Sequence, residues 1–148
     1  LKAALNRIHL GKLVYVLIGV KQIFAKKTVR AKLYLDDAPV MKLPELFFVV
    51  GMNHMYEGGG IPFCPNADPT DGRLDVCLVK GMSRLKLLLA VVLVYFKKHL
   101  LFKGITNHRC KKMRLVTETP QWIHMDGETP YQVSEVTWES KGKLRFVR

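Results

Sequence analysis

Residues 46–80 read LFFVVGMNHMYEGGGIPFCPNADPTDGRLDVCLVK, and this stretch decides the fold. It begins with a continuous apolar run at 46–50, which predicts a strand buried on both faces. It ends in a second predicted strand, where Leu74, Val76 and Leu78 alternate with other residues. Between the two, residues 51–72 are rich in glycine, proline, asparagine and aspartate. This composition predicts a long ordered loop, and such loops often carry function.

Upstream of this stretch, the sequence predicts a helix followed by a strand. Apolar residues recur at helical spacing in the first 25 residues. The stripe that they form consists of Leu13, Val16, Leu17, Val20, Ile23 and Phe24. Residues 28–35 then alternate between polar and apolar, which indicates a half-buried strand, and the Asp-Asp-Ala-Pro sequence at 36–39 predicts a turn.

Downstream, the sequence predicts a second helix and several strands. Ser83 is a candidate N-cap for a helix over residues 84–99. We expect the packed face of this helix to consist of Leu85, Leu88, Leu89, Val92 and Phe96. Strands are expected near 112–117, 121–125, 131–138 and 143–147, with a bulge where the apolar parity changes between Val133 and Val136. The prediction is a mainly β (α+β) chain, an antiparallel β-sandwich-like domain with about two helices.

Composition limits the classes of partner. The chain has 148 residues, which suits one domain spanning 1–148, and its formal net charge is +12. Such a surplus attracts phosphate groups, nucleic acid or an anionic membrane, although it also serves solubility. Cys64, Cys77 and Cys110 match no zinc or disulfide pattern, which favours a reducing, cytoplasmic setting. The longest apolar run, 87–96, is too short to cross a bilayer.

Three clusters have residue types suited to chemistry. The three glycines at 58–60 let the backbone approach a phosphate or a lipid head group, or simply make a tight turn. Asp68 and Asp71 can point to one side of a turn and, with the carbonyl of Arg73, would suit Mg²⁺, although ordinary turn chemistry also explains them. Glu128, in Asp-Gly-Glu, could take a proton from a substrate hydroxyl or could stand in a plain hairpin turn.

Taken in order, these motifs resemble the diacylglycerol kinase and sphingosine kinase superfamily, and most of all its bacterial soluble lipid kinases. The resemblance rests on Asn53, Gly58-Gly59-Gly60, Pro65-Asn66-Ala67, Asp71-Gly72-Arg73-Leu74-Asp75-Val76, His99 after a helix, and Asp126-Gly127-Glu128. It covers nearly the whole chain and is most specific over residues 58–79. It implies a β-sandwich of the NAD kinase/diacylglycerol kinase-like type.

The resemblance also implies two domains, one that binds ATP and one that binds the lipid acceptor. The chain would be the C-terminal, lipid-acceptor domain, inactive alone, and the N-terminal nucleotide-binding domain with its GGDGT loop would be missing, since no GGDGT occurs here. ATP would be bound mainly by that missing domain. Glu128 matches the general base of the family. Asp71 matches a ligand of a structural Mg²⁺, with Asp68 and the Arg73 carbonyl as its companions.

The expected function is therefore that of an ATP-dependent lipid kinase of phospholipid biosynthesis, acting on diacylglycerol or a similar lipid alcohol. Its expected partners are that lipid, an anionic membrane surface and the missing domain. A homodimer is possible. The expected location is the cytoplasm, at the surface of a membrane. Alternatives are a non-catalytic lipid- or membrane-binding module and an NAD kinase-like domain. Nucleic acid is not an expected partner, because aromatic residues are not interleaved with Lys and Arg. Glu135 and Glu139 are rival carboxylates.

Overall fold

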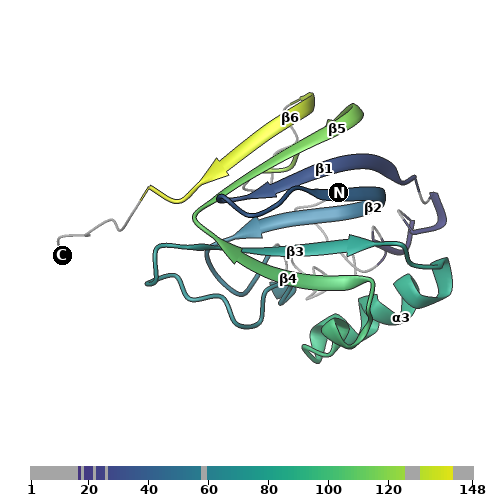
Figure 1. Ribbon diagram of the computed structural model, residues 1–148. Helices are drawn as coiled ribbons and strands as arrows, with labels where there is room; N and C mark the ends of the chain where they lie inside the picture. Colours follow the sequence, from purple (N-terminus) through teal and green to yellow (C-terminus); the bar gives the residue numbers. More distant parts are fainter. Residues whose placement is uncertain are drawn as a thin grey trace.

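The fold is one curled antiparallel sheet. The computed structural model describes residues 17, 19–21, 23–25, 27–57, 60–125 and 131–141. Its strands are β1 (Val29–Leu35), β2 (Met41–Met52), β3 (Leu74–Lys80), β4 (Ile105–Cys110), β5 (Lys112–Trp122) and β6 (Gln132–Glu139). They form a six-stranded sheet in the order β4-β3-β2-β1-β5-β6 (Figure 1). Together with two short helices, this confirms the predicted mainly β, sandwich-like fold.

The curl of the sheet is fixed at the corner between β4 and β5. Only Lys111 separates these strands, although β4 is an edge strand and β5 pairs with β1. Asp36, in the β1–β2 turn, holds this corner with its carboxylate. Its Oδ1 accepts from the backbone N–H of Lys111 at 2.9 Å and of Lys112 at 2.8 Å. Asp36 has a φ of 47°, a left-handed conformation that aspartate tolerates better than most residues.

β3 is buried on both faces and separates two apolar cores. Val76 and Leu78 belong to the inner core, which lies within the curl of the sheet and consists of Ala31, Leu33, Leu35, Leu43, Leu46, Val76, Leu78, Cys110, Met113 and Leu115. The alternate residues Cys77 and Val79 belong to the helix-side core. That core consists of Ile23, Met52, Cys64, Cys77, Val79, Met82, Leu87, Ala90 and Ile105.

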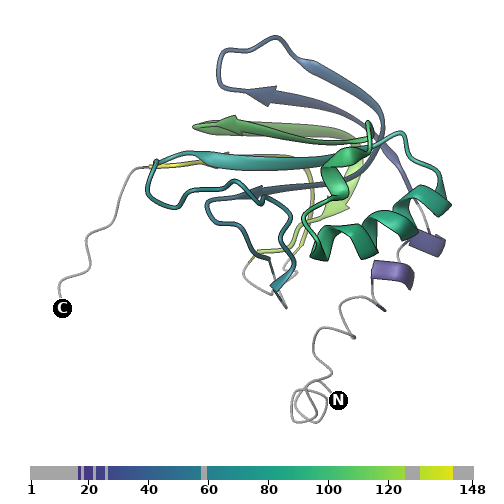
Figure 2. The same ribbon diagram turned by 90° about the horizontal axis from the view of Figure 1, so that it is seen from below.

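α3 (Arg84–Tyr95) covers the helix side of the sheet, as Figure 2 shows, and it begins as predicted. The Oγ of Ser83 accepts from the N–H of Lys86 at 3.4 Å. The helix ends earlier than predicted, because Lys97 adopts a left-handed φ of 58°. The N–H of Lys98 then donates to the carbonyl of Leu93 and that of Lys97 to the carbonyl of Val94, which is the Schellman pattern of helix ends. A 3₁₀ turn, η2 (His99–Leu101), follows.

The predicted packed face of α3 is wrong. The residues buried against the sheet are Leu87, Ala90 and Val94. Four of the five residues expected there are exposed instead, namely Leu85, Leu89, Val92 and Phe96, while Leu88 is half-buried. The cause is that apolar residues surround the helix, so spacing alone did not identify the face that packs.

The helical prediction for the N-terminal region is tested only in part. The described residues between 17 and 25 are helical, and Ile23 is buried as expected. Leu17 and Phe24 of the predicted stripe are exposed, however. Leu13 and Val16 lie outside the described residues. No helix in the described part of the chain has the length and apolar character to cross a membrane.

The strand predictions hold with three differences. β2 begins at Met41, earlier than predicted, and of residues 46–50 only Leu46 is buried, so this run is not buried on both faces. β4 was not predicted, and the expected strands at 112–117 and 121–125 belong to one strand, β5. The predicted bulge is present, because the β5–β6 register shifts between Val116, opposite Glu135, and Gln121, opposite Val133. The strand expected at 143–147 lies outside the described residues.

Candidate functional site

An apolar cavity of about 230 Å³ lies between α3 and the sheet. Its walls come from β2, β3, β4, α3, η2, the loop after β2 and the helical residues before β1. The residues that line it are Gly19, Ile23, Phe47, Phe48, Ile61, Phe63, Cys77, Val79, Leu87, Ala90, Val91, Val94, Tyr95, His99 and Ile105. Drug-sized pockets occupy roughly 300–1,000 Å³, so this cavity suits part of a long apolar ligand rather than a whole one. The sequence did not predict it, because its walls come from segments far apart in the chain.

Two residues of the cavity wall carry buried polar atoms without a hydrogen-bond partner among the described residues: the hydroxyl of Tyr95 and Nδ1 of His99. His99 Nε2 lies 3.0 Å from the carbonyl oxygen of Phe63, which can only accept, so Nε2 carries the proton and Nδ1 is left as an acceptor. Burial lowers the pKa of His99, and the bond to Phe63 opposes that shift in part. Both atoms are covered by the surrounding protein, so the surface that the cavity presents to a ligand is apolar.

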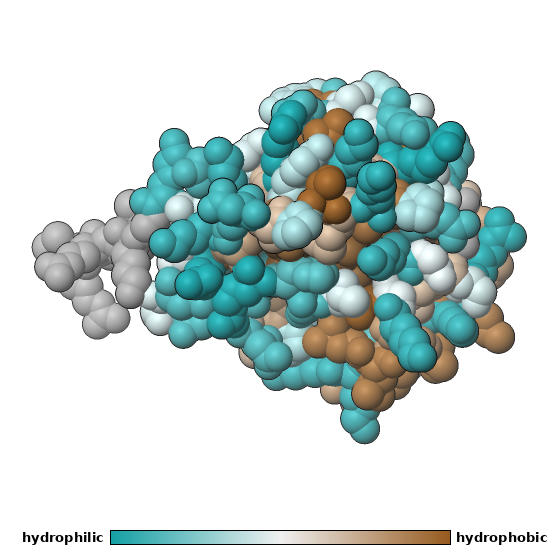
Figure 3. All heavy atoms as spheres, in the orientation of Figure 1, coloured by the Kyte–Doolittle hydropathy of each residue, from teal (hydrophilic) through white to brown (hydrophobic). Residues whose placement is uncertain are grey.

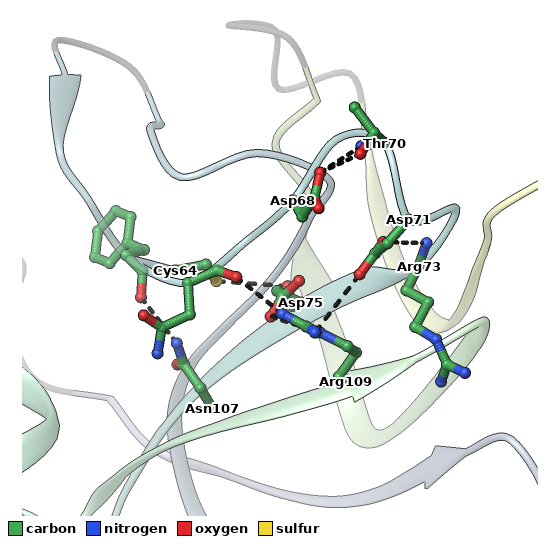
Figure 4. Close-up of polar contacts among 10 residues, drawn as sticks. Cys64, Asp68, Thr70, Asp71, Arg73, Asp75, Asn107 and Arg109 are labelled. Atoms are coloured by element: carbon green, nitrogen blue, oxygen red, sulfur yellow. Dashed lines mark hydrogen bonds and ion pairs between the residues drawn. The ribbon is translucent and has the colours of Figure 1, made fainter. Parts of the chain in front are cut away.

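Residues on β4 hold the loop that joins the cavity to the acidic turn. Asn107 and Arg109 are two residues apart and so lie on one face of the strand. The Asn107 side chain donates to the carbonyl of Phe63 at 3.5 Å. Arg109 Nη2 donates to the carbonyl of Asn66 at 2.8 Å. These contacts fix both ends of one loop segment against the sheet (Figure 4).

The acidic turn is ordered by its own side chains. Asp68 Oδ1 accepts from the backbone N–H of Thr70 at 2.8 Å and from its hydroxyl at 2.6 Å. Asp71 Oδ1 accepts from the N–H of Arg73 at 2.8 Å, and Gly72 between them has a φ of 72°. The predicted residues therefore lie together on one turn, as Figure 4 shows.

Two further charged residues, which the sequence did not assign to the site, complete this cluster. Asp75 on β3 and Arg109 on β4 are opposite each other in the sheet register. Arg109 Nη2 lies 3.4 Å from Asp75 Oδ1, and its Nη1 lies 3.6 Å from Asp71 Oδ2. A charged residue inside the apolar strand 74–79 was the signal that could have identified Asp75. Arg109 had no comparable signal.

The carboxylates of this cluster outnumber its cation, so a further positive charge nearby would be favourable. Burial raises the pKa of Asp75, Arg109 lowers it, and the carboxylates of Asp71 and Asp68 raise it further. Asp75 Oδ2 has no hydrogen-bond partner among the described residues. The carboxylates thus lie close enough to repel one another, with Arg109 as the cation that opposes this repulsion.

The donor set of the turn fits the expected Mg²⁺ in type. Carboxylate and carbonyl oxygens are the ligands that hard cations prefer. Within the described ranges, no three His, Cys, Asp or Glu side chains are grouped to hold a metal. Magnesium usually retains several waters, so Asp68, Asp71 and the carbonyl of Arg73 would supply only part of its shell.

The predicted base, Glu128, lies outside the described residues, as do Gly58, Gly59, Asp126 and Gly127. The chain on either side of residues 126–130 is described. The N–H of Ile123 donates to the carbonyl of Tyr131 at 3.3 Å. His124 Nδ1 lies 3.8 Å from Glu57 Oε1. This contact brings the residue before the glycines next to the residues before Asp-Gly-Glu, so flanks of two predicted clusters meet.

Other groups are less suited to catalysis. Glu135 is held on the sheet surface by Arg114, whose Nε lies 2.7 Å from Glu135 Oε1, and this hydrogen bond lowers the pKa of Glu135. Glu139 lies at the end of β6. The thiols of Cys64 and Cys77 are free and buried, and burial raises the pKa of each to about 12. These thiols are therefore protonated at neutral pH and are poor nucleophiles.

Comparisons with known proteins point in one direction. Residues 2–141 match the family model described as "YegS C-terminal NAD kinase beta sandwich-like domain". A protein of Bacillus subtilis strain 168 named "Putative lipid kinase YtlR" is 30% identical over 94 residues, covering 61% of this chain and 30% of that protein. A protein of Mycobacterium tuberculosis strain H37Rv named "Diacylglycerol kinase" is 26% identical over 131 residues, covering 85% of this chain and 41% of that protein.

Solved structures agree on the fold. One described as "Crystal structure of a putative diacylglycerol kinase from Bacillus anthracis str. Sterne" superposes with a TM-score of 0.63 at 23% identity. The match covers 84% of this chain and 42% of that one. The chain thus spans less than half the length of these relatives.

Proposed function

The chain belongs to the family of YegS C-terminal NAD kinase beta sandwich-like domains, and from this membership we propose that it is the acceptor-side domain of an ATP-dependent lipid kinase. The acceptor would be the hydroxyl of diacylglycerol or of a similar lipid alcohol. The observation that carries the proposal is the apolar cavity between α3 and the sheet. A small polar alcohol would find no hydrogen-bond partners on such apolar walls, so they favour a lipid acceptor.

The cavity would bind part of an acyl chain. Its walls are almost entirely apolar, so burial of each methylene contributes about 0.8 kcal/mol to binding. Tyr95 and His99 would contact the acyl chain through the carbon atoms of their rings, because their unpaired polar atoms are covered by the surrounding protein. The remainder of the lipid would extend towards the missing domain or the membrane.

Glu128 would be the general base. Its carboxylate would take the proton from the lipid hydroxyl as that oxygen bonds to the γ-phosphorus of ATP. The bond from phosphorus to the bridging oxygen breaks, and ADP leaves. The N-terminal domain of the full-length protein would bind ATP, in line with relatives more than twice as long as this chain. The protein would act at the cytoplasmic face of a membrane.

The test of this proposal is phosphate transfer from ATP to diacylglycerol in mixed micelles by the intact protein that contains this chain. Glu128→Gln should lower kcat by at least ~100-fold, with the thermal midpoint unchanged. Glu135→Gln and Glu139→Gln are matched controls on the following strand and should retain activity. Full activity in Glu128→Gln would remove this residue from the role of base.

A non-catalytic lipid-binding module is the second candidate, since the cavity alone favours it. It predicts that the intact protein binds diacylglycerol but transfers no phosphate to any lipid alcohol. Radiolabelled ATP and thin-layer chromatography of the lipids distinguish the two candidates directly.

We also propose that Asp68, Asp71 and the Arg73 carbonyl bind a structural Mg²⁺ that braces the loop against β4. Binding to the folded state alone raises the thermal midpoint with the logarithm of ion concentration. Millimolar MgCl₂ should therefore stabilise the wild-type protein but not Asp71→Asn. Asp37→Asn, in the turn after β1, is the control and should respond like the wild type. An equal response in all three proteins would place the ion elsewhere.

A further inference from the structure

The outer face of α3 is apolar and exposed. Leu85, Leu89, Val92 and Phe96 are 77%, 51%, 55% and 67% exposed. Their spacing of four, three and four residues makes a single stripe along the helix. We call this stripe the outer face of α3, and Figure 3 shows hydrophobic side chains gathered over this helix. A helix that is apolar on all sides is normally covered on all sides.

Positive charge flanks the outer face at both ends. Arg84 and Lys86 lie in the first turn, and Lys97 and Lys98 directly follow the helix; all four are exposed. No Asp or Glu occurs in the sequence between Asp75 and Glu118. An apolar stripe framed by cations matches an anionic lipid surface, where apolar side chains enter the head-group region and lysines reach the phosphates.

The opposite face of the same helix lines the cavity. Leu87, Ala90 and Val94 face the sheet and form part of the cavity wall. α3 therefore has one apolar face towards the space proposed for an acyl chain and another towards the outside. A protein or second-copy interface would explain the apolar stripe, but it would not explain why the helix and its flanking segments carry Lys and Arg and no Asp or Glu.

We propose that the outer face of α3 is a membrane-docking surface that inserts Leu85, Leu89, Val92 and Phe96 into the head-group region of an anionic bilayer. This docking rests on the proposed function, because it would serve to hold the cavity against the membrane that supplies the lipid. The docking itself requires no catalysis.

The test is co-sedimentation of the intact protein with vesicles of phosphatidylcholine containing about 30% phosphatidylglycerol. The double variant Leu89→Ser with Phe96→Ser should lower the partition coefficient about tenfold or more, because two inserted side chains are lost. Lys97→Gln with Lys98→Gln should lower it by a similar factor and should have little effect on vesicles without phosphatidylglycerol. Val40→Ser, at another exposed apolar residue in the turn after β1, is the control and should bind like the wild type.

Either of two results would overturn the proposal: no wild-type binding to anionic vesicles, or unchanged binding by the Leu89/Phe96 variant. A dimer of the wild type that becomes a monomer in this variant, with vesicle binding intact, would assign the face to a second copy instead. Failure of docking is distinct from failure of the kinase proposal. Glu128→Gln should still bind vesicles, and the α3 variant should still phosphorylate a short-chain, water-soluble diacylglycerol.

Discussion

The two sides of β3 differ in how completely they are packed. Val76 and Leu78 lie in the inner core and are fully buried, whereas Cys77 and Val79 on the other side line a cavity. Protein interiors normally pack without voids larger than a water molecule. The hollow beside Cys77 and Val79 supports the proposal that the helix side binds a ligand, whereas the residues packed around Val76 and Leu78 stabilise the fold.

The sharpest comparison uses the same substitution on the two faces of β3. Val76→Ala removes two methyl groups from the inner core, where exposure is 0%, and should lower the free energy of unfolding by about 2–3 kcal/mol. Val79→Ala acts at the cavity wall and should cost about 1 kcal/mol less, because fewer partner atoms surround the side chain. Urea unfolding at constant m value measures both. Equal costs would mean that the helix side is packed as tightly as the inner core.

The second comparison adds volume instead of removing it. Val76→Leu in the inner core should cost about 1–3 kcal/mol through overpacking, because Val76 is fully buried there. Ala90→Leu, on the inner face of α3, can extend into the cavity and should cost less than about 1 kcal/mol. If the cavity binds an acyl chain, Ala90→Leu should raise KM for long-chain diacylglycerol more than for a short-chain analogue, and an unchanged ratio would contradict that role.

The third prediction concerns the corner that encloses the inner core. Asp36→Ala should lower stability by about 1–2 kcal/mol, because two backbone N–H groups lose their acceptor and alanine disfavours a φ of 47°. Asp36→Asn keeps an acceptor oxygen and tolerates this conformation, so it should cost less. Asp37→Ala in the same turn is the control and should leave thermal unfolding unchanged.

Residues with strong local patterns were predictable from the sequence. The alternation of Val76 and Leu78, the cap at Ser83 and the change of parity before Val136 each depend on near neighbours. α3 was located for the same reason, but its packed face was not, because apolar residues surround it. β4 was missed because its middle residues are polar and only its ends, Ile105 and Cys110, are buried.

The candidate site was predictable by residue type but not by partner. Asp68 and Asp71 belong to a dense local motif, and the structure brings them together on one turn. Arg109 contacts Asp71 from a strand far along the chain, and nothing in the sequence near it marks that contact. The cavity is also a tertiary feature, since its walls come from segments that only the sheet order brings together.

The smallest expected effect is a pH dependence of the free energy of unfolding, caused by the buried imidazole of His99. His99 is 2% exposed and lines the cavity, and burial lowers its pKa, so the folded protein holds this imidazole neutral. The unfolded chain has an ordinary pKa of about 6.5 and therefore binds a proton first as the pH falls. Stability that is fully present above that value should be lost as the pH drops towards the lower folded pKa, with a slope of at most about 1.4 kcal/mol per pH unit.

His99→Gln should flatten this slope between about pH 7.5 and pH 5 in urea unfolding. His108 is the comparison, because burial and then Lys80 lower its pKa too, although it lies on β4 and does not line the cavity. His108→Gln should remove its own part of the slope independently. If the cavity binds lipid, saturating diacylglycerol should extend the His99 contribution alone to lower pH, because a ligand that fills the cavity buries the ring further and lowers its folded pKa. A ligand effect on both histidines, or on neither, would place the lipid outside the cavity wall.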